Sequence, residues 1–333
     1  MTATRFDVLG LGNAIVDVLA HAEDDFLIAN KLHKGAMRLI DEAEADRLYA
    51  AMGPATIVSG GSVANSIVGV ASLGGRAAYI GKVKADEVGR HFTHDIRATG
   101  VHFATPPAQD GPATARSFIL VTPDGERTMN TYLGACQNLG PADVDRATVE
   151  ASAYIYLEGY LWDREHAKQA FRTAASIAHA AGNKVALTLS DGFCVDRFRD
   201  EFLGLMRHGS LDILFANESE LKSLYQTADF DTALAALREE NLLGVVTRSE
   251  EGCLVVSRDE TVAVPAAPIE ELVDTTGAGD LFAAGFLYGL ARGFDAATCA
   301  RHGALAAAEI IQHLGARPAA NLRALAEENG LPV

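Results

Sequence analysis

The order of apolar runs along the chain constrains its fold more than any other feature. Short runs rich in valine, isoleucine and leucine alternate with longer stretches in which apolar residues recur at helical spacing. The runs are FDVLGLG (6–12), AAYIG (77–81), YIYLEG (154–159), KVALTLS (184–190), DILFAN (212–217), LGVVT (243–247) and CLVVS (253–257). Such runs are typical of parallel strands buried on both faces. Their alternation with helices predicts an α/β fold with a doubly wound, mostly parallel sheet flanked by helices, whose ligands bind beyond the carboxyl ends of the strands.

Two stretches depart from this pattern and predict a second, smaller β layer. Residues 15–40 and 99–135 look like antiparallel strands with turns, and the part ATARSFILVTPDGERTMNTYLG alternates apolar and polar residues around a Pro-Asp-Gly turn. We expect this layer to cover the site as a lid, although an ordinary surface hairpin would have the same pattern. The large α/β domain, which would bind nucleotide and carry out catalysis, is expected to comprise residues 1–14, 41–98 and 136–333.

Charge and cysteine content exclude several classes of partner. The 44 acidic and 28 basic residues give a formal net charge of −16, which would repel a nucleic-acid backbone. The four cysteines lie far apart without CxxC spacing, so neither a zinc site nor a disulfide framework is expected. No apolar stretch reaches the roughly 18 residues of a membrane span, and the first residues lack a signal-peptide pattern. We therefore expect a soluble, cytoplasmic protein with no nucleic-acid or membrane partner.

Two glycine-containing segments resemble nucleotide-binding loops only in part. GLGNAI (10–15) follows a strand, but isoleucine takes the place of the third glycine of a dinucleotide fingerprint, and the helix that should open there is missing. GGRAAYIGKV (74–83) has five residues between Gly75 and Gly81, where a P-loop has four, and valine where a P-loop has serine or threonine. Neither segment is expected to bind a nucleotide.

Two other segments place polar residues at the start of an expected helix. In GGSVANS (60–66), paired glycines would allow the backbone to approach a ligand, and Asn65 offers an amide in the first turn. A glycine turn with Ser62 as N-cap would explain the same residues. In NESE, Asn217 and Glu220 have the spacing of a capping box. The alternative is that their oxygens organise the water shell of Mg²⁺, a cation that keeps several waters.

The segment VDTTGAGDLFAAGFLYGLA (273–291) is the most specific signal in the chain. Gly277 and Gly279 allow backbone amides to turn outward at a helix N-terminus, where the helix dipole and the unpaired donors favour a phosphoryl group. Asp280 lies in the first turn beside this anion hole, although a carboxylate there could simply complement the helix dipole. The helix that follows is apolar or small all round, which indicates that it is buried. A polar, anion-binding cap on a buried helix predicts a ligand site.

Taken together, these segments resemble the ribokinase/PfkB carbohydrate kinase family over nearly the whole chain. The matching segments are GNAIVDV (12–18), GGSVANSIVGVASLGGRAAYIGKVKADEVGRHF (60–92), NESE (217–220), VVT (245–247) and DTTGAGDLFAAGF (274–286). The resemblance implies a ribokinase-like fold and a kinase that uses ATP and Mg²⁺. In that family the second aspartate of DTxGAGD takes the proton from an acceptor hydroxyl, while the GAG backbone holds the γ-phosphate.

The resemblance implies roles for individual residues. Asp280 would be the catalytic base, and the anion hole would consist of Gly277, Ala278 and Gly279. The residues expected to bind the acceptor are Asp17, Gly61 and Asn65. The residues expected at Mg²⁺, phosphate and ATP are Asn217, Glu220, Thr247 and Gly252. The residues that resemble a region holding a monovalent cation, such as K⁺, in many relatives are Asp274, Thr276 and the segment LGARP (314–318).

The chain departs from the family pattern in its nucleotide loop. Relatives commonly have T-x-G-x-x-G after the strand, whereas this chain reads TRSEEG, with Ser249 at the first glycine position. The loop is therefore expected to differ in backbone shape.

Within the family, the details resemble adenosine kinases and similar nucleoside kinases. GNAIVDV resembles their GNPLLD-type opening, and LSDGF (189–193) resembles their LSAPF segment, so Phe193 would stack on a nucleobase, unless it is a core aromatic. The expected reaction transfers the γ-phosphoryl group of ATP to a primary hydroxyl, the 5′-OH of a nucleoside. The alternatives are a sugar kinase acting on ribose, fructose or 2-keto-3-deoxygluconate, and a non-catalytic nucleoside-binding sensor. Monomer and homodimer both remain open.

Overall fold

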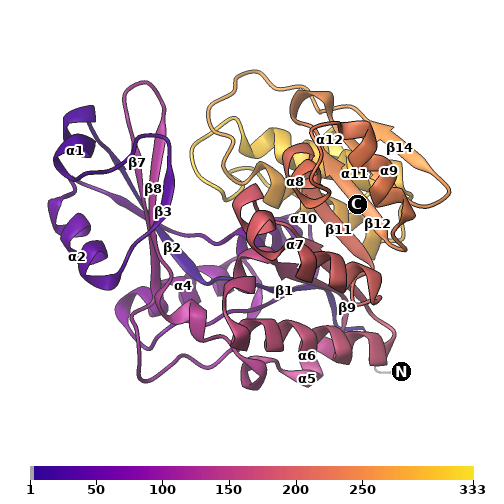
Figure 1. Cartoon of the computed structure of the whole chain (residues 1–333), viewed down its shortest axis with the longest axis horizontal. Helices are drawn as coiled ribbons and strands as arrows, with labels where there is room; N and C mark the ends of the chain where they lie inside the picture. The colour runs from indigo at the N-terminus through magenta and orange to yellow at the C-terminus, as the bar shows by residue number, and fades with distance from the viewer. Residues whose placement is uncertain (1–3) are drawn as a thin grey trace.

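Residues 4–333 are described by a computed structural model, and they form two β-sheets with helices packed against them (Figure 1). The strands of the larger sheet, in spatial order, are β14 (Thr261–Val264), β13 (Cys253–Val256), β12 (Leu243–Thr247), β11 (Ile213–Asn217), β10 (Lys184–Thr188), β9 (Ser152–Glu158), β1 (Phe6–Leu11), β5 (Ala77–Ile80) and β6 (His102–Phe103). Every neighbouring pair from β12 to β6 is parallel. The predicted doubly wound, mostly parallel α/β fold is confirmed.

The edge of this sheet differs from the prediction. β12 pairs antiparallel with β13, and β13 pairs antiparallel with β14. The strand β14 itself was not expected from the sequence. The expectation of a parallel strand at 253–257 is therefore wrong in direction. An apolar run indicates a buried strand but does not specify its direction. Only a short 3₁₀ turn, η4 (Ser249–Glu251), separates β12 from β13, and a connection this short permits an antiparallel pair but no parallel one.

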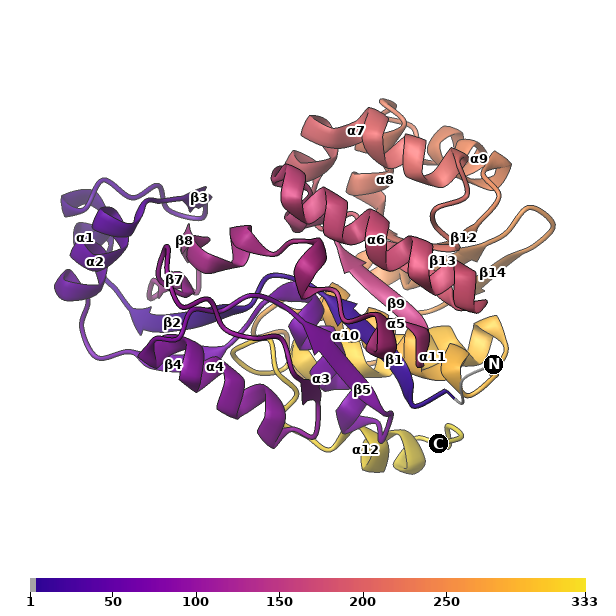
Figure 2. The same cartoon turned by 90° about the horizontal axis from the view of Figure 1, so that it is seen from below.

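Helices cover both faces of the large sheet, as Figure 2 shows. One buried cluster joins the sheet to α3 (Ser62–Ser72), α4 (Glu87–Ala98), α10 (Ala278–Ala291), α11 (Ala296–Ile310) and α12 (Leu322–Glu328). A second cluster joins the other face to α5 (Arg146–Glu150), α6 (Glu165–Ala181), α7 (Gly192–Arg207), α8 (Glu218–Leu224) and α9 (Phe230–Glu239). The remaining short 3₁₀ elements are η1 (Gly134–Asn138), η2 (Pro141–Asp143) and η3 (Gly159–Asp163). Across residues 4–333, no helix combines the length and apolar content that a bilayer crossing requires.

The smaller sheet stands to one side of the large layer (Figure 1). Its strands, in spatial order, are β3 (Met37–Leu39), β8 (Arg127–Tyr132), β7 (Ala115–Val121), β2 (Ile15–His21) and β4 (Thr56–Ser59). The pairs β7/β8 and β2/β4 are antiparallel, whereas β2/β7 and β3/β8 are parallel. The all-antiparallel expectation is thus right for the hairpin and wrong for two of the pairs. Two helices, α1 (Asp24–Ala29) and α2 (Glu42–Ala51), pack on one face through Leu27 and Leu48.

The chain enters the small sheet twice. Its first passage runs from β2 through β4, and its second is the β7–β8 hairpin. The sequence-based division assigned 41–98 to the large domain and 99–135 to the lid. In the structure, β4 lies in the small sheet although it falls within the first range, and β6 lies in the large sheet although it falls within the second.

Glycine allows helices α10 and α11 to pack with their backbones in contact. An added Cβ at Gly285 would lie 2.3 Å from the carbonyl oxygen of His302, and one at Gly303 would lie 2.7 Å from that of Phe282. Both obstacles are backbone atoms, so no side-chain rotation could relieve them. This contact fixes α10, whose residues from Leu281 to Gly289 are buried.

We expect Gly285→Ala to lower the free energy of unfolding by about 1–3 kcal/mol, because the added methyl group must push α10 and α11 apart. Urea denaturation would measure the change. Alanine is normally a better helix residue than glycine by about 1 kcal/mol, so propensity alone predicts the opposite sign. Gly192→Ala is the matched control, since nothing lies within 4 Å of the added Cβ at that helical position. Equal stability of Gly285→Ala and the unmodified protein would contradict the close packing.

Candidate active site

The N-terminus of α10 presents backbone donors that lack a partner. Gly277 is the N-cap and has φ of 82°, a left-handed conformation that favours glycine. The Thr276 amide donates to Asp274 Oδ1 (3.0 Å), and the Ala278 amide donates to the Thr275 carbonyl (3.2 Å). Within residues 4–333, the amides of Gly277, Gly279 and Asp280 have no acceptor. These three, rather than the Ala278 amide expected from the sequence, are the donors available to an anion at this helix end.

The space beside these amides is open. An added Cβ at Gly279 would meet nothing within 4 Å, whereas one at Gly277 would lie 3.0 Å from Ala316. A phosphate could therefore approach on the Gly279 side. The geometry fits the terminal phosphate of a nucleotide better than a buried structural cap, because a buried cap would have its donors paired.

Asp280 is held by two donors from α3. Its Oδ1 accepts a hydrogen bond from Ser62 Oγ (2.6 Å), and its Oδ2 accepts one from Asn65 Nδ2 (3.0 Å). Burial raises the pKa of Asp280 above the ordinary aspartate value, while the two hydrogen bonds and the charge of Arg317 act in the opposite direction. The N-cap of α3 is Gly61, so Ser62 does not have the N-cap role considered from the sequence. Its hydroxyl instead orients the carboxylate.

Asp17 lies against the glycine turn before α3. An added Cβ at Gly60 would come within 2.2 Å of Asp17 Oδ2, and one at Gly61, which has φ of 95°, would lie 2.2 Å from the Asn13 carbonyl. Burial raises the pKa of Asp17 to about 7; the charge of Asp280 adds to the rise, and Arg317 opposes it. The structure thus brings Asp17, Gly61 and Asn65, which the sequence analysis expected to bind the acceptor, close to Asp280.

Beneath this group is a buried carboxyl that the sequence reasoning did not select. Glu158 is 1% exposed and accepts hydrogen bonds from the Asn13 amide (3.2 Å), Asn13 Nδ2 (2.7 Å) and the Val63 amide (3.0 Å). Burial raises the pKa of Glu158 to about 7, opposed by these donors. Glu158 therefore ties β1 and the first turn of α3 to the end of β9. A glutamate within the apolar run YIYLEG was the available signal.

Arg127 links the small sheet to the anion hole and was also missed from the sequence. It is the first residue of β8; its guanidinium forms an ion pair with Asp274, and its Nη1 donates to Thr276 Oγ1 (2.9 Å). Asp274 Oδ2 also accepts from the Gly315 amide (3.1 Å). The side chains of Asp274 and Thr276 are thus engaged, so a monovalent cation in this region would depend on carbonyl oxygens.

Arg317 reaches across to the start of α3. Its Nε donates to the Ser59 carbonyl (2.9 Å), its Nη1 to the Ala64 carbonyl (3.2 Å) and its Nη2 to the Gly60 carbonyl (3.4 Å). The sequence placed this residue only within the segment 314–318 that resembles a cation-binding region. In the structure, the positively charged guanidinium of Arg317 itself lies beside the glycine turn.

The second group of expected residues lies at the ends of β11 and β12. Asn217 and Glu220 form the capping box of α8, with each Glu220 oxygen accepting one hydrogen bond from Asn217 (2.7 and 2.9 Å). Burial, and to a smaller extent the charge of Asp191, raises the pKa of Glu220 to about 7, against the Asn217 amide. Residues 4–333 contain no group of three acidic, histidine or cysteine side chains suited to a metal. A contact of Glu220 with Mg²⁺ through water stays a prediction.

The nucleotide loop follows β12, which ends at Thr247. Gly252 has φ of 86°, and an added Cβ there would lie 2.1 Å from the Val264 carbonyl, so only glycine fits. Ser249 has φ of 50°, which is uncommon for a residue other than glycine. Ser249 thus has a left-handed conformation in which glycine would be unstrained, at some cost in backbone strain.

Tyr160 connects the two groups. It is the second residue of η3, which follows β9, and the charges of Asp191, Asp280 and Glu220 all help burial to raise its pKa. The acceptor-side carboxylate and the capping box therefore face one region at the carboxyl edge of the sheet, as expected for a doubly wound fold.

Phe193 lies in the first turn of α7 at the same edge. Its side chain is 61% exposed, so the alternative of a core aromatic is wrong. The guanidinium carbon of Arg197 lies 4.4 Å from the centre of its ring. Stacking of Phe193 on a nucleobase stays a prediction.

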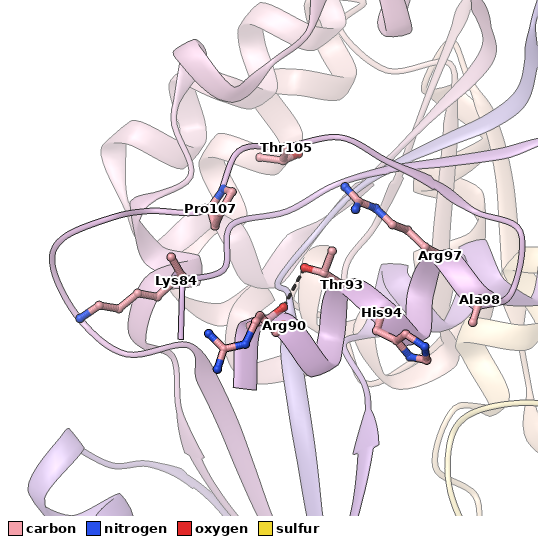
Figure 3. Close-up of a pocket in the computed structure, with 10 residues that line it drawn as sticks. Lys84, Arg90, Thr93, His94, Arg97, Ala98, Thr105 and Pro107 are labelled. Carbon is pink, nitrogen blue, oxygen red and sulfur yellow. Dashed lines mark hydrogen bonds between the residues drawn. The ribbon is translucent and has the colours of Figure 1, made fainter. Parts of the chain in front are cut away.

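A hollow of about 690 Å³ lies elsewhere, between α4 and the loop around Thr105 (Figure 3). Several basic residues line it, but two of them hold the neighbouring loop. Arg97 donates through Nε and Nη2 to the Phe103 carbonyl (2.9 and 2.6 Å), and Lys84 Nζ donates to the Gly111 carbonyl (2.6 Å). None of the site residues expected from the sequence lines this hollow.

Comparison with known proteins finds several similar to this chain. Residues 37–322 match the model of the pfkB family carbohydrate kinases. The structure is similar to that of adenosine kinase from Sinorhizobium meliloti, with 55% identity, a TM-score of 0.92 and coverage of 98% of this chain and 99% of that one. It is also similar to a probable sugar kinase from Rhizobium etli CFN 42, with 53% identity, a TM-score of 0.94 and coverage of 99% and 100%. Fructokinase-1 of Oryza sativa subsp. japonica is 30% identical over 234 residues, which are 68% of this chain and 72% of the fructokinase.

Proposed function

Because this chain belongs to the pfkB family of carbohydrate kinases, which are phosphotransferases with an alcohol acceptor, we propose that it transfers the γ-phosphoryl group of ATP to a primary hydroxyl of adenosine or a related nucleoside. The observation that carries the proposal is the joint geometry at the start of α10. The unpaired amides of Gly277 and Gly279 belong to the same helix turn as Asp280, whose carboxylate two α3 side chains orient. Donors for a phosphate and an acceptor for a proton thus occupy one helix turn.

In the proposed reaction, the acceptor oxygen forms a bond to the γ-phosphorus as the bond from that phosphorus to the bridging oxygen of ADP breaks. The hydroxyl proton passes to the carboxylate of Asp280, and ADP leaves. The amides of Gly277, Gly279 and Asp280 stabilise the charge of the transferring group, and they need no reorganisation because the helix already fixes them. Phosphoryl transfer depends mainly on such positioning and electrostatic stabilisation.

The acceptor would bind between the two sheets. Asp17 and Asn65 offer carboxylate and amide oxygens for sugar hydroxyls, and Gly61 leaves room for the acceptor beside the backbone. We propose that the small sheet acts as a lid, and that Arg127 on β8 brings a positive charge to the phosphoryl group. Its present contacts with Asp274 and Thr276 support that role, because they hold the guanidinium beside the anion hole.

The nucleotide side would use the ends of β11 and β12. Thr247 and Gly252 would line the ATP site, and Asn217 and Glu220 would orient the water shell around the phosphates. Mg²⁺, when bound with ATP, would neutralise charge on those phosphates. A carboxylate that reaches it only through water fits this chemistry.

The nucleoside assignment has two supports. The similar protein from Sinorhizobium meliloti is named an adenosine kinase. Phe193 is an exposed aromatic ring at the carboxyl edge of the sheet, where a base could stack on it. A sugar kinase is the second candidate, favoured by the similarity to the probable sugar kinase from Rhizobium etli and to the rice fructokinase.

We expect ADP release to be fastest with adenosine in a panel that also contains inosine, cytidine, ribose, fructose and 2-keto-3-deoxygluconate. A coupled ADP assay with equal concentrations of each acceptor would rank them. ADP formed only with the free sugars would overturn the nucleoside assignment. Adenosine binding without any ADP release would instead indicate a non-catalytic sensor.

Phe193→Ala supplies a control within the same panel. Loss of a stacking partner should raise KM for nucleosides about two- to twelve-fold, which corresponds to the 0.5–1.5 kcal/mol of an aromatic pair. The KM for any free sugar should not change. Equal effects on nucleosides and sugars would argue against base stacking.

A further inference from the structure

Two carboxyl groups, Asp17 and Glu158, lie near the proposed base Asp280, and the three groups affect one another. Asp280 raises the pKa of both Asp17 and Glu158, and burial raises the pKa of all three. The titratable and charged groups that face Asp280 are Asp17 on β2, Tyr156 and Glu158 on β9, Tyr160 in η3 and Arg317 in the segment after α11. Arg317 is the positively charged member of this set, whereas the charge of Arg127 interacts with Asp17 and Asp274.

The guanidinium of Arg317 is fixed at this place by the backbone. Its hydrogen bonds to the carbonyls of Ser59, Gly60 and Ala64 enclose the turn that begins α3. The same turn carries Ser62 and Asn65, which hold Asp280. Arg317 therefore makes three hydrogen bonds to the α3 turn that holds Asp280. Its positive charge also acts on the Asp280 carboxyl.

A general base must be ionised before it can accept a proton. Ser62 and Asn65 are neutral donors, so they favour the carboxylate form of Asp280 only by hydrogen bonding. The positive charge of Arg317 also lowers the pKa of Asp280, with a smaller effect than either hydrogen bond. Burial lowers the pKa of Arg317 to about 10, which still leaves the guanidinium charged at neutral pH.

The segment that carries Arg317 is anchored independently of its guanidinium. Glu309 Oε1 accepts hydrogen bonds from the amides of Ala319 (2.9 Å) and Ala320 (2.7 Å). Asp274 accepts one from the Gly315 amide (3.1 Å). Removal of the guanidinium should thus leave the segment in place.

We propose that Arg317 is a positioning residue that holds the α3 turn that orients Asp280, and that its positive charge favours the carboxylate form of Asp280 at neutral pH. This inference rests on the proposed function, because it assigns Arg317 an effect on the proposed base. The arginine acts through Asp280 and needs no contact with either substrate.

The test is the pH dependence of kcat for Arg317→Gln, Arg317→Lys and the unmodified protein, measured with the best acceptor of the panel. Activity that needs ionised Asp280 falls as the pH drops through its pKa. Loss of the nearby positive charge raises that pKa, so the acid limb should move upward by about one pH unit in Arg317→Gln. The kcat of this variant should recover at alkaline pH. Arg317→Lys retains a charge and should leave the limb close to its original position.

Arg127→Gln is the matched control, because it removes a cation that faces Asp17 instead of Asp280. Its rate should fall while its acid limb stays in place. An unmoved limb in Arg317→Gln, with kcat reduced equally at every pH, would overturn the inference and leave only a structural role. An equal shift in Arg317→Lys and Arg317→Gln would also overturn the charge argument. If Arg317→Gln does not fold, an acid limb of Arg317→Lys that moves upward by about one pH unit relative to the unmodified protein would overturn it, because lysine retains the charge. The proposed function fails separately, if the unmodified protein releases no ADP with any acceptor.

Discussion

Asp280→Asn is expected to lower kcat by about 10²- to 10⁴-fold, the usual contribution of a general base. Asparagine has nearly the same shape as aspartate, and the Ser62 hydroxyl, which donates to Asp280 at 2.6 Å, can rotate to accept from the new amide. Substrate binding should therefore change little. Steady-state kinetics with adenosine and ATP, together with calorimetric ATP binding, would separate the two effects.

This variant should not be less stable than the unmodified protein. Burial raises the pKa of Asp280, so the folded state disfavours its ionised form at neutral pH, and a neutral asparagine removes that cost. Asp295→Asn makes the same chemical change at the N-cap of α11, where asparagine and aspartate are about equally favourable, and should leave kcat unaltered. A kcat for Asp280→Asn within tenfold of the unmodified protein would eliminate Asp280 as the base.

Asp274→Ala is expected to lower the free energy of unfolding by about 3–5 kcal/mol, because it breaks a buried ion pair on one side. The side chains of Asp274 and Arg127 are 2% and 13% exposed. The alanine would leave the Arg127 guanidinium without its counter-charge and the amides of Thr276 and Gly315 without their acceptor. Urea denaturation followed by circular dichroism would measure the loss.

Glu327→Ala provides the comparison for an exposed pair. Glu327 lies opposite Arg323 at 3.3 Å with both side chains 53% exposed, and such pairs contribute about 0.3–0.5 kcal/mol. If Asp274→Ala lowered the free energy of unfolding no more than Glu327→Ala, the Asp274–Arg127 ion pair would not hold the segment before α10 to the small sheet.

Much of the large domain was predictable because its signals are local. A short apolar run, a glycine turn and a capped helix each occupy a few consecutive residues, so β1, α3 and α10 could be placed from the sequence. Strand direction and sheet membership are long-range properties. The segment 253–257 was correctly expected to be a buried strand, yet only its pairing with β12 shows that it is antiparallel. β4 likewise joins the small sheet through its pairing with β2.

The candidate site divides in the same way. Gly277 and Asp280 belong to one turn, so their chemistry could be inferred from neighbouring letters. Ser62, Glu158, Arg127 and Arg317 contribute through partners far away in the chain, and nothing in their own neighbourhoods identifies those partners. Arg317 illustrates this most clearly, since its hydrogen bonds to Ser59 and Gly60 span more than 250 positions.

If the small sheet covers the acceptor, as proposed, the two separate passages of the chain through it limit how a chain of this kind can acquire a new acceptor. A binding module encoded by one contiguous stretch can be exchanged between relatives in a single recombination event. Here the segment from β2 to β4 and the β7–β8 hairpin must pair through the parallel β2/β7 ladder. If only one of these two segments came from a relative, its side chains would not match those of the other segment along this ladder. Divergence in acceptor preference should therefore proceed by individual substitutions that remain compatible across that ladder, and chimaeras joined between positions 60 and 114 should fold poorly.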